Sequence, residues 1–213
     1  MANATGGVER PSSSALPHDR YTDTRYEYAD ANGQPLVIEN SLPKGGLTYT
    51  TPVGKAYVYV IFWTRIVNKT AAPIRLSVAV PVDSFKLADE PATSVALPTT
   101  APVSTGKGLP APDNYFKIIF PAEEMTEEKA PLMNYGLKDV SAVVGHKRRH
   151  SSSFQLTVQP KATRFIYVVV LASRARNGIM RAGFNVRGDK LYYRVNEQDI
   201  YCGQSTTILR WSS

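Results

Sequence analysis

The sequence is poor in the residues that most often build disulfides and metal sites. Its 213 residues include one cysteine and three histidines. A single cysteine excludes an intramolecular disulfide framework and argues against a thiolate zinc site. No apolar run reaches the roughly 18 residues that a membrane-spanning helix needs. We therefore expect no membrane span, no metal and no cofactor.

Catalytic motifs are also missing. The chain has no G-x-S-x-G elbow, no P-loop and no G-x-G-x-x-G fingerprint. His146 and His150 have the spacing of two ligands on one helical face, but three cations lie between them, so we expect an exposed basic loop. The lone Cys202 is expected to be a small, inert core residue. We predict no catalytic residue, and hence a protein that is not an enzyme.

Two other local patterns have simple structural interpretations. The acidic pairs Glu123-Glu124 and Glu127-Glu128 favour a helix start or a solvated turn over a glycosidase pair, whose carboxylates come from distant segments. Asn68-Lys69-Thr70 and Asn3-Ala4-Thr5 match the N-glycosylation pattern, which is short and frequent by chance.

Alternation of apolar and polar residues predicts strands along most of the chain. Residues 55–68 and 164–172 are apolar on both faces, which is typical of central strands buried on both sides. Residues 74–80 alternate strictly, with one polar and one apolar face, and we expect them to pair with 55–68 as a hairpin. Gly188-Asp189 is interpreted as the turn of a second hairpin. Residues 200–202 and 207–209 are expected to be two short strands at the end.

These elements favour an all-β fold with one or two short helices, within 122–129 and 132–144, the second ending at Gly145. We predict an antiparallel two-sheet β-sandwich, immunoglobulin-like in the loose sense, with a jelly roll or a partly closed barrel as the alternative. Residues 1–20 are expected to be a flexible tail without the apolar segment of a signal peptide. Residues 21–213 would form one domain that carries a long Pro-rich loop at 82–114.

The net charge of +7 is concentrated in the second half of the chain. Residues 1–106 contain nine basic and nine acidic residues, whereas the residues from His146 onward contain twelve basic and three acidic ones. Such an asymmetry indicates an anionic partner or a solvated face. The candidate contact residues for an anion or another partner are Lys147, Arg148, Arg149, Arg174, Arg176, Arg181, Arg187, Lys190, Tyr192 and Arg194.

Three functions fit this pattern. The first is a non-enzymatic binding or assembly domain that contacts a protein or glycan through loops and an exposed sheet face. The second is a polyanion-binding module for nucleic acid or acidic glycan, built from the basic C-terminal third. The third is a subunit of a capsid or another assembly.

No motif assigns the chain to a family. The tyrosine-rich strands and the Pro-rich loop are similar in general style to secreted or periplasmic accessory domains of bacteria. That likeness favours a setting outside the cytoplasm, but fold style alone does not define a function.

Overall fold

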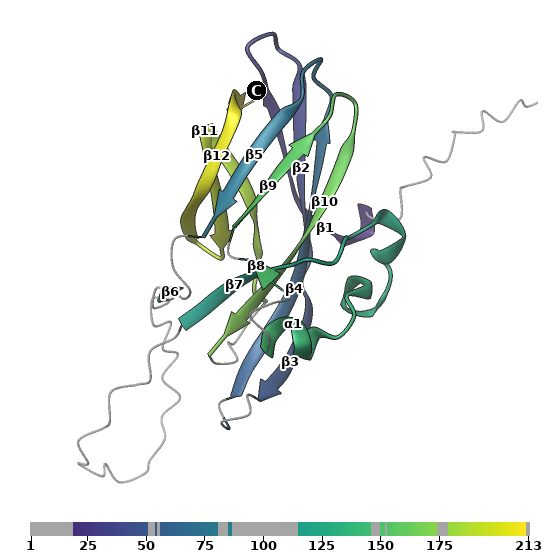
Figure 1. Cartoon of the computed structure of the whole chain (residues 1–213), viewed down its shortest axis with the longest axis vertical. Helices are drawn as coiled ribbons and strands as arrows, with labels where there is room; N and C mark the ends of the chain where they lie inside the picture. Colours follow the sequence, from purple (N-terminus) through teal and green to yellow (C-terminus); the bar gives the residue numbers. More distant parts are fainter. Residues whose placement is uncertain are drawn as a thin grey trace, which may run out of the picture.

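The computed structural model describes residues 19–50, 54, 56–80, 85–86, 115–145, 150–151, 153–173 and 179–211. The fold is all-β, as predicted, and its strands form one antiparallel sheet that is nearly closed into a barrel (Figure 1). The twelve strands are β1 Thr22–Ala29, β2 Pro35–Ser41, β3 Lys44–Thr50, β4 Ala56–Asn68, β5 Ile74–Ala79, β6 Phe85–Lys86, β7 Tyr115–Pro121, β8 His150–Ser151, β9 Ser153–Val158, β10 Thr163–Ala172, β11 Ala182–Val195 and β12 Gln198–Trp211.

The order of the strands explains the near closure. The main path runs β6-β7-β10-β4-β2-β1-β12-β5-β9, while β11 pairs with β12, β3 with β4 and β8 with β7. Two short links connect the β6-to-β1 part of this path with the β12-to-β9 part. Tyr28 and Ala29 of β1 pair with Trp211 and Arg210 of β12. On the other side, β8 pairs with β7 and lies just before β9 in the chain.

The interior is filled by the inward side chains of nearly every strand. Phe62 and Ile66 of β4, Val168 and Val170 of β10 and Phe184 of β11 belong to one core cluster and are almost fully buried. This cluster draws on strands far apart in the sequence, so it joins the two ends of the sheet path into one packed body.

A second apolar cluster lies on the outer face of β4, β7 and β10. Ile61 and Trp63 of β4 and Val169 of β10 pack there beneath residues 122–145, which we call the covering segment. It contains η2 Glu127–Lys129, η3 Met133–Gly136 and α1 Val140–Gly145. The prediction that 55–68 and 164–172 are buried on both faces is confirmed, because one face meets the interior and the other meets the covering segment.

The predicted hairpin between 55–68 and 74–80 is wrong. β4 pairs with β10, β2 and β3, whereas β5 pairs with β12 and β9. The intervening residues carry the chain from one part of the sheet to another instead of making a tight turn. Alternation defines the faces of a strand but does not identify its neighbours.

The hairpin predicted at Gly188-Asp189 is also wrong. Residues 182–195 form one continuous strand, and the pairing with β12 shifts register between Gly188 and Lys190. Gly188 has a φ of 68°, as expected for a β-bulge that places glycine in the left-handed region. The bulge changes which side of β11 faces inward, from Phe184 and Val186 to Leu191 and Tyr193. Likewise, the two short strands expected at 200–202 and 207–209 are parts of the single strand β12.

The predicted helices are shorter than expected. Only one 3-10 turn forms within 122–129, while α1 ends at Gly145 as predicted. None of the helices in the described ranges is long and apolar enough to cross a membrane. The expected tail up to residue 18 and the Pro-rich loop, apart from Phe85-Lys86, lie outside the described residues.

Candidate functional site

One outer face of the nearly closed sheet carries mostly polar side chains that are exposed or partly exposed. It is formed by β9, β5, β12 and β11, which are hydrogen-bonded in that order. Figure 1 shows the covering segment beside β3 and β4, whereas β11, β12 and β5 lie on the other side of the view. Within the described part of the chain, no helix or loop buries the polar side chains of this surface. We call it the uncovered face, and its central side chains are Gln155, Thr157, Arg75, Ser77, Gln204, Thr206 and Lys190.

Strand register places four of these residues in one straight row. Lys190 of β11 lies opposite Gln204 of β12, Gln204 lies opposite Ser77 of β5, and Ser77 lies opposite Gln155 of β9. Neighbouring strands are about 4.8 Å apart, so the row extends for about 14 Å. We call these four residues the central row.

A hollow of about 380 Å³ lies over the middle of this face. The short side chain of Ser77 stands between the longer side chains of Gln155 and Gln204, which accounts for the depression. The next row adds Arg75, with Thr157 opposite it on β9, and the backbone N–H of Arg75 donates to Thr206 Oγ1 at 3.2 Å. Hydroxyl, amide and guanidinium groups therefore line one shallow site.

An aromatic pair borders the central row beside Lys190. Tyr192 lies opposite Tyr201, and their ring centroids are 5.8 Å apart with an interplanar angle of 70°. Tyr201 is 44% exposed. The guanidinium of Arg187 lies 4.9 Å from the centre of the Tyr192 ring. The uncovered face thus offers an aromatic surface next to its hydrogen-bonding groups.

Two of the predicted arginines are engaged by one carboxylate. Arg194 donates to Asp199 through Nε at 2.7 Å and through a second nitrogen at 3.0 Å, and Arg187 also pairs with Asp199. The hydrogen bond from Arg194 is the main reason that the pKa of Asp199 is lowered, and it also raises the pKa of Arg194. Asp199 therefore offsets part of the positive charge that the sequence places here.

Arg181 lies apart, in a second hollow of about 190 Å³ between β1 and the start of β11. It pairs with Asp23, and its backbone N–H donates to Asn196 Oδ1 at 3.0 Å. Buried Asn40 also lines this hollow; its amide donates to Phe184 O at 3.0 Å, and its Oδ1 accepts from Phe184 N at 2.9 Å. The polar groups that line this hollow therefore form mainly internal hydrogen bonds and ion pairs, which connect β11 with β1 and β2.

The structure therefore divides the ten predicted contact residues. Lys190 and Tyr192 lie on the uncovered face, with Arg187 and Arg194 beside them around Asp199. Arg181 lies in the other hollow, which Arg194 also lines. The remaining five, Lys147, Arg148, Arg149, Arg174 and Arg176, lie outside the described residues.

Sequence reasoning missed the neutral members of the site. Alternation within 74–80 predicted that Ser77 lies on a polar face, and this is confirmed; Gln155 is exposed as well. Neutral polar residues on a strand are not by themselves a signal for binding. Their importance comes from the register, which aligns them with Gln204 and Lys190.

The other residues considered from the sequence are placed as follows. Cys202 is fully buried as expected, and burial raises the pKa of its thiol to about 12. Asn68 is fully buried, and its Nδ2 donates to Ala72 O and Val158 O, so it is inaccessible to glycosylation in the folded protein. Among the residues that the structure describes, no group of three potential metal ligands is present.

Comparison with known proteins gave no relative. No family model, curated protein or solved structure matches the chain.

Proposed function

We propose that this chain is a non-catalytic binding domain that contacts its partner through the uncovered face and the adjoining loops. The observation that carries the proposal is the central row, Lys190, Gln204, Ser77 and Gln155. The side chains of Ser77, Gln155 and Gln204 form no hydrogen bond with any described residue, and they line the larger hollow. Their donors and acceptors are therefore available to a partner.

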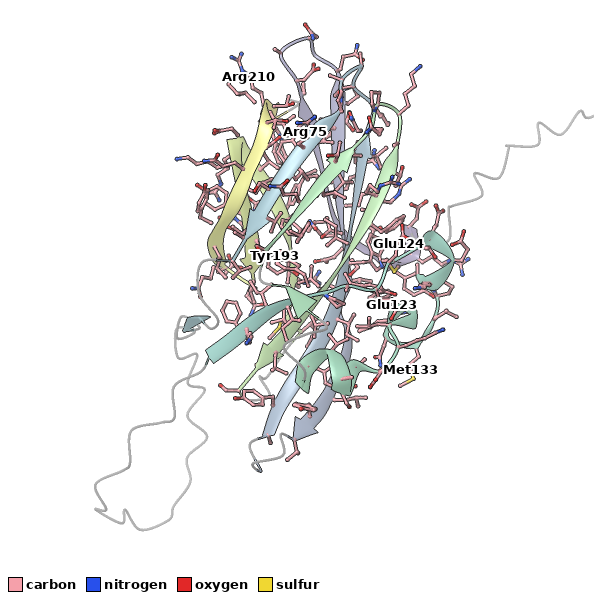
Figure 2. The ribbon with its side chains drawn as sticks, viewed as in Figure 1. Arg75, Glu123, Glu124, Met133, Tyr193 and Arg210 are labelled. Atoms are coloured by element: carbon pink, nitrogen blue, oxygen red, sulfur yellow. The ribbon has the colours of Figure 1, made fainter. Side chains whose placement is uncertain are left out.

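The charge distribution supports an anionic partner. The four strands of the uncovered face carry five cationic side chains and two carboxylates. The covering segment carries two pairs of glutamates, Glu123-Glu124 and Glu127-Glu128. Figure 2 shows Arg75 and Arg210 on one side of the molecule and Glu123 and Glu124 on the other. A polyanion-binding module is therefore the second candidate function.

An assembly subunit is the third candidate. Ile208 and Trp211 of β12 are 64% and 61% exposed, and exposed apolar residues of this size favour contacts with another chain. Light scattering over a wide concentration range tests this candidate. A mass that increases with concentration in the wild type and not in Ile208→Ser supports it, whereas a constant monomer mass contradicts it.

We also propose that the fold is a two-sheet sandwich whose sheets are joined at their corners. The β6-β7-β10-β4-β2-β1 strands and the β9-β5-β12-β11 strands contribute facing side chains to one interior cluster. Among the described strands, the two groups pair directly only at the short β1–β12 contact, while β8 pairs with β7 and leads along the chain into β9. Corners formed by strands that change sheet are typical of such packing.

An array of glycans and nucleic acids, probed at low and moderate salt, tests the binding function. The double variant Gln155→Ala/Gln204→Ala removes both walls of the hollow, and Gln34→Ala, an exposed glutamine in the turn after β1, is the matched control. We expect the double variant to lose the binding that the wild type and the control retain. Binding that is equal in all three proteins, or no binding to any member of the array, would contradict the proposal.

A further inference from the structure

The side chains that line the larger hollow indicate which chemical class of partner the uncovered face would bind. Around Ser77 the site offers two primary amides, from Gln155 and Gln204, and the hydroxyls of Thr157 and Thr206. Amides and hydroxyls both donate and accept hydrogen bonds, as sugar hydroxyls do. The volume of about 380 Å³ lies within the range of roughly 300–1,000 Å³ usual for ligand sites.

The cations of this face are few and separated. Lys190 and Arg75 lie two strands and one row apart, which corresponds to about 12 Å between their Cα atoms. This separation is longer than one pyranose ring. Neither residue forms a salt bridge with a carboxylate of the described residues. They could each take a carboxylate from a different sugar of one chain, while the neutral groups between them bind the hydroxyls.

The aromatic pair completes a sugar-binding surface. Tyr192 and Tyr201 border the central row next to Lys190, and Tyr201 exposes nearly half of its surface. The apolar faces of sugar rings pack on aromatic rings of this kind. The hydroxyl-binding hollow and the aromatic surface lie side by side on one sheet face.

The same set of side chains argues against nucleic acid as the partner. Single-stranded nucleic acid is gripped by a continuous line of cations along its phosphates and by aromatic rings that stack its bases. Here Gln, Ser and Thr side chains occupy the positions between Arg75 and Lys190, and Arg210 lies near the far end of β12. Arg187 and Arg194, which lie beside Tyr192 on β11, both form ion pairs with Asp199.

We propose, resting on the binding function proposed above, that the uncovered face binds an acidic polysaccharide built from uronic acid units. A sugar ring occupies the hollow between Gln155 and Gln204, and its neighbours' carboxylates pair with Arg75 and Lys190. Tyr192 and Tyr201 pack against the ring that follows toward β11. The carboxylates, and not the hydroxyls alone, are required for affinity.

The test compares three polymers. Polygalacturonate carries the carboxylates, its fully methyl-esterified form keeps the pyranose rings without the charge, and single-stranded DNA is a polyanion without uronic acid units. Isothermal titration at low salt measures each Kd for the wild type and for Arg75→Gln. Arg164→Gln, an exposed arginine on β10 outside this face, is the matched control.

We expect polygalacturonate to bind the wild type and Arg164→Gln equally, and Arg75→Gln about tenfold more weakly, as for one lost charge-assisted hydrogen bond. The methyl ester should bind at least about tenfold more weakly than the free acid on the same grounds. Equal binding of ester and acid, tighter binding of DNA, equal weakening in the two variants or no polygalacturonate binding would each overturn the inference.

The outcomes also separate this inference from the binding function itself. If a neutral glycan or DNA binds and the Gln155→Ala/Gln204→Ala variant loses it, the uncovered face is a binding surface and only the acidic sugar is wrong. If polygalacturonate binds equally to that double variant and to the wild type, the face itself is wrong.

Discussion

At the scale of single residues, the contact between β2 and β11 depends on one amide and one glycine. Asn40 donates to and accepts from the backbone of Phe184, so its side chain replaces a strand partner at this point. Gly183, the residue before Phe184, lies against that amide. A Cβ built on Gly183 would lie 2.2 Å from Asn40 Cγ. The close approach therefore requires the absence of a side chain.

Substitution Gly183→Ala should destabilise the fold by about 2 kcal/mol, because the added methyl overpacks a filled site. Urea unfolding followed by tryptophan fluorescence measures the change. Gly33→Ala is the control: nothing lies within 4 Å of its Cβ, and its φ of 73° makes the cost one of backbone strain, about 1 kcal/mol. A loss at Gly183 no larger than the loss at Gly33 would show that the predicted close contact is not present.

Asn68 is a second residue whose side chain organises the backbone. Its Oδ1 accepts from Thr70 N at 2.9 Å and from Thr70 Oγ1 at 2.7 Å, while its Nδ2 donates to Ala72 O and Val158 O. Replacement Asn68→Ala leaves these groups buried without partners, so we expect a loss of about 3 kcal/mol in the free energy of unfolding. The exposed Asn32→Ala serves as the control for urea unfolding, and equal midpoints for the two variants would disprove this role.

At the scale of elements, the sequence predicted strands and their faces better than their neighbours. The two-sided burial of β4 and β10 followed directly from apolar residues on both faces. The strands that pair with β5 could not be predicted, because residues Ile74 to Ala79 alternate in the same way whichever strand lies beside them. Gly188 could equally mark a turn or a bulge, since both use a left-handed glycine and both change which residues face inward.

The residues of the candidate site could likewise be predicted only in part from the sequence. Lys190 and Tyr192 could be proposed from basic and aromatic composition alone. Gln155, Ser77 and Gln204 could not, because their alignment depends on pairings between residues 78 and 127 positions apart in the sequence.

The covering segment is another element whose attachment can be tested. Lys44 Nζ donates to Ala130 O and Leu132 O, both at 2.7 Å, and lies 4.3 Å and 4.2 Å from the ring centres of Tyr21 and Tyr135. These contacts fasten the segment to β3.

Replacement Lys44→Met should therefore loosen the covering segment without unfolding the sheet. We expect hydrogen exchange within 125–143 to become at least about tenfold faster, because two charge-assisted hydrogen bonds are lost. Exchange in β5 and β12 should stay unchanged. Lys138→Met, an exposed lysine on the same segment, is the control. Unchanged exchange in Lys44→Met, or the same increase in Lys138→Met, would contradict this account.

At the scale of the whole molecule, two opposite faces of the sheet differ in whether another part of the chain covers them. One is sealed by an acidic covering segment over an apolar cluster, and the other is left polar, basic and open. The covered side completes the core, whereas the side chains of the open side could contact a partner without disturbing core packing.

The closed core also predicts how stability depends on pH. Burial raises the pKa values of Tyr28, Tyr135 and Cys202 to about 12, from ordinary values of 10.0 for the phenols and 9.0 for the thiol. The unfolded chain loses these protons first, so stability is retained below about pH 9 and falls as the pH rises toward about 12. Urea midpoints across this range measure the decline. It should be less steep in Tyr28→Phe, and the same slope in wild type and variant would contradict the assignment to this residue.

The central claim is that the uncovered face is the binding surface, and a hydrogen-exchange footprint tests it most directly. Exchange is measured for the intact chain with and without saturating polygalacturonate. The structure predicts slower exchange in β5, β9 and β12, with residues 122–145 unchanged. Protection centred on residues 122–145, or no protection in β5, β9 and β12 at saturation, would contradict the claim.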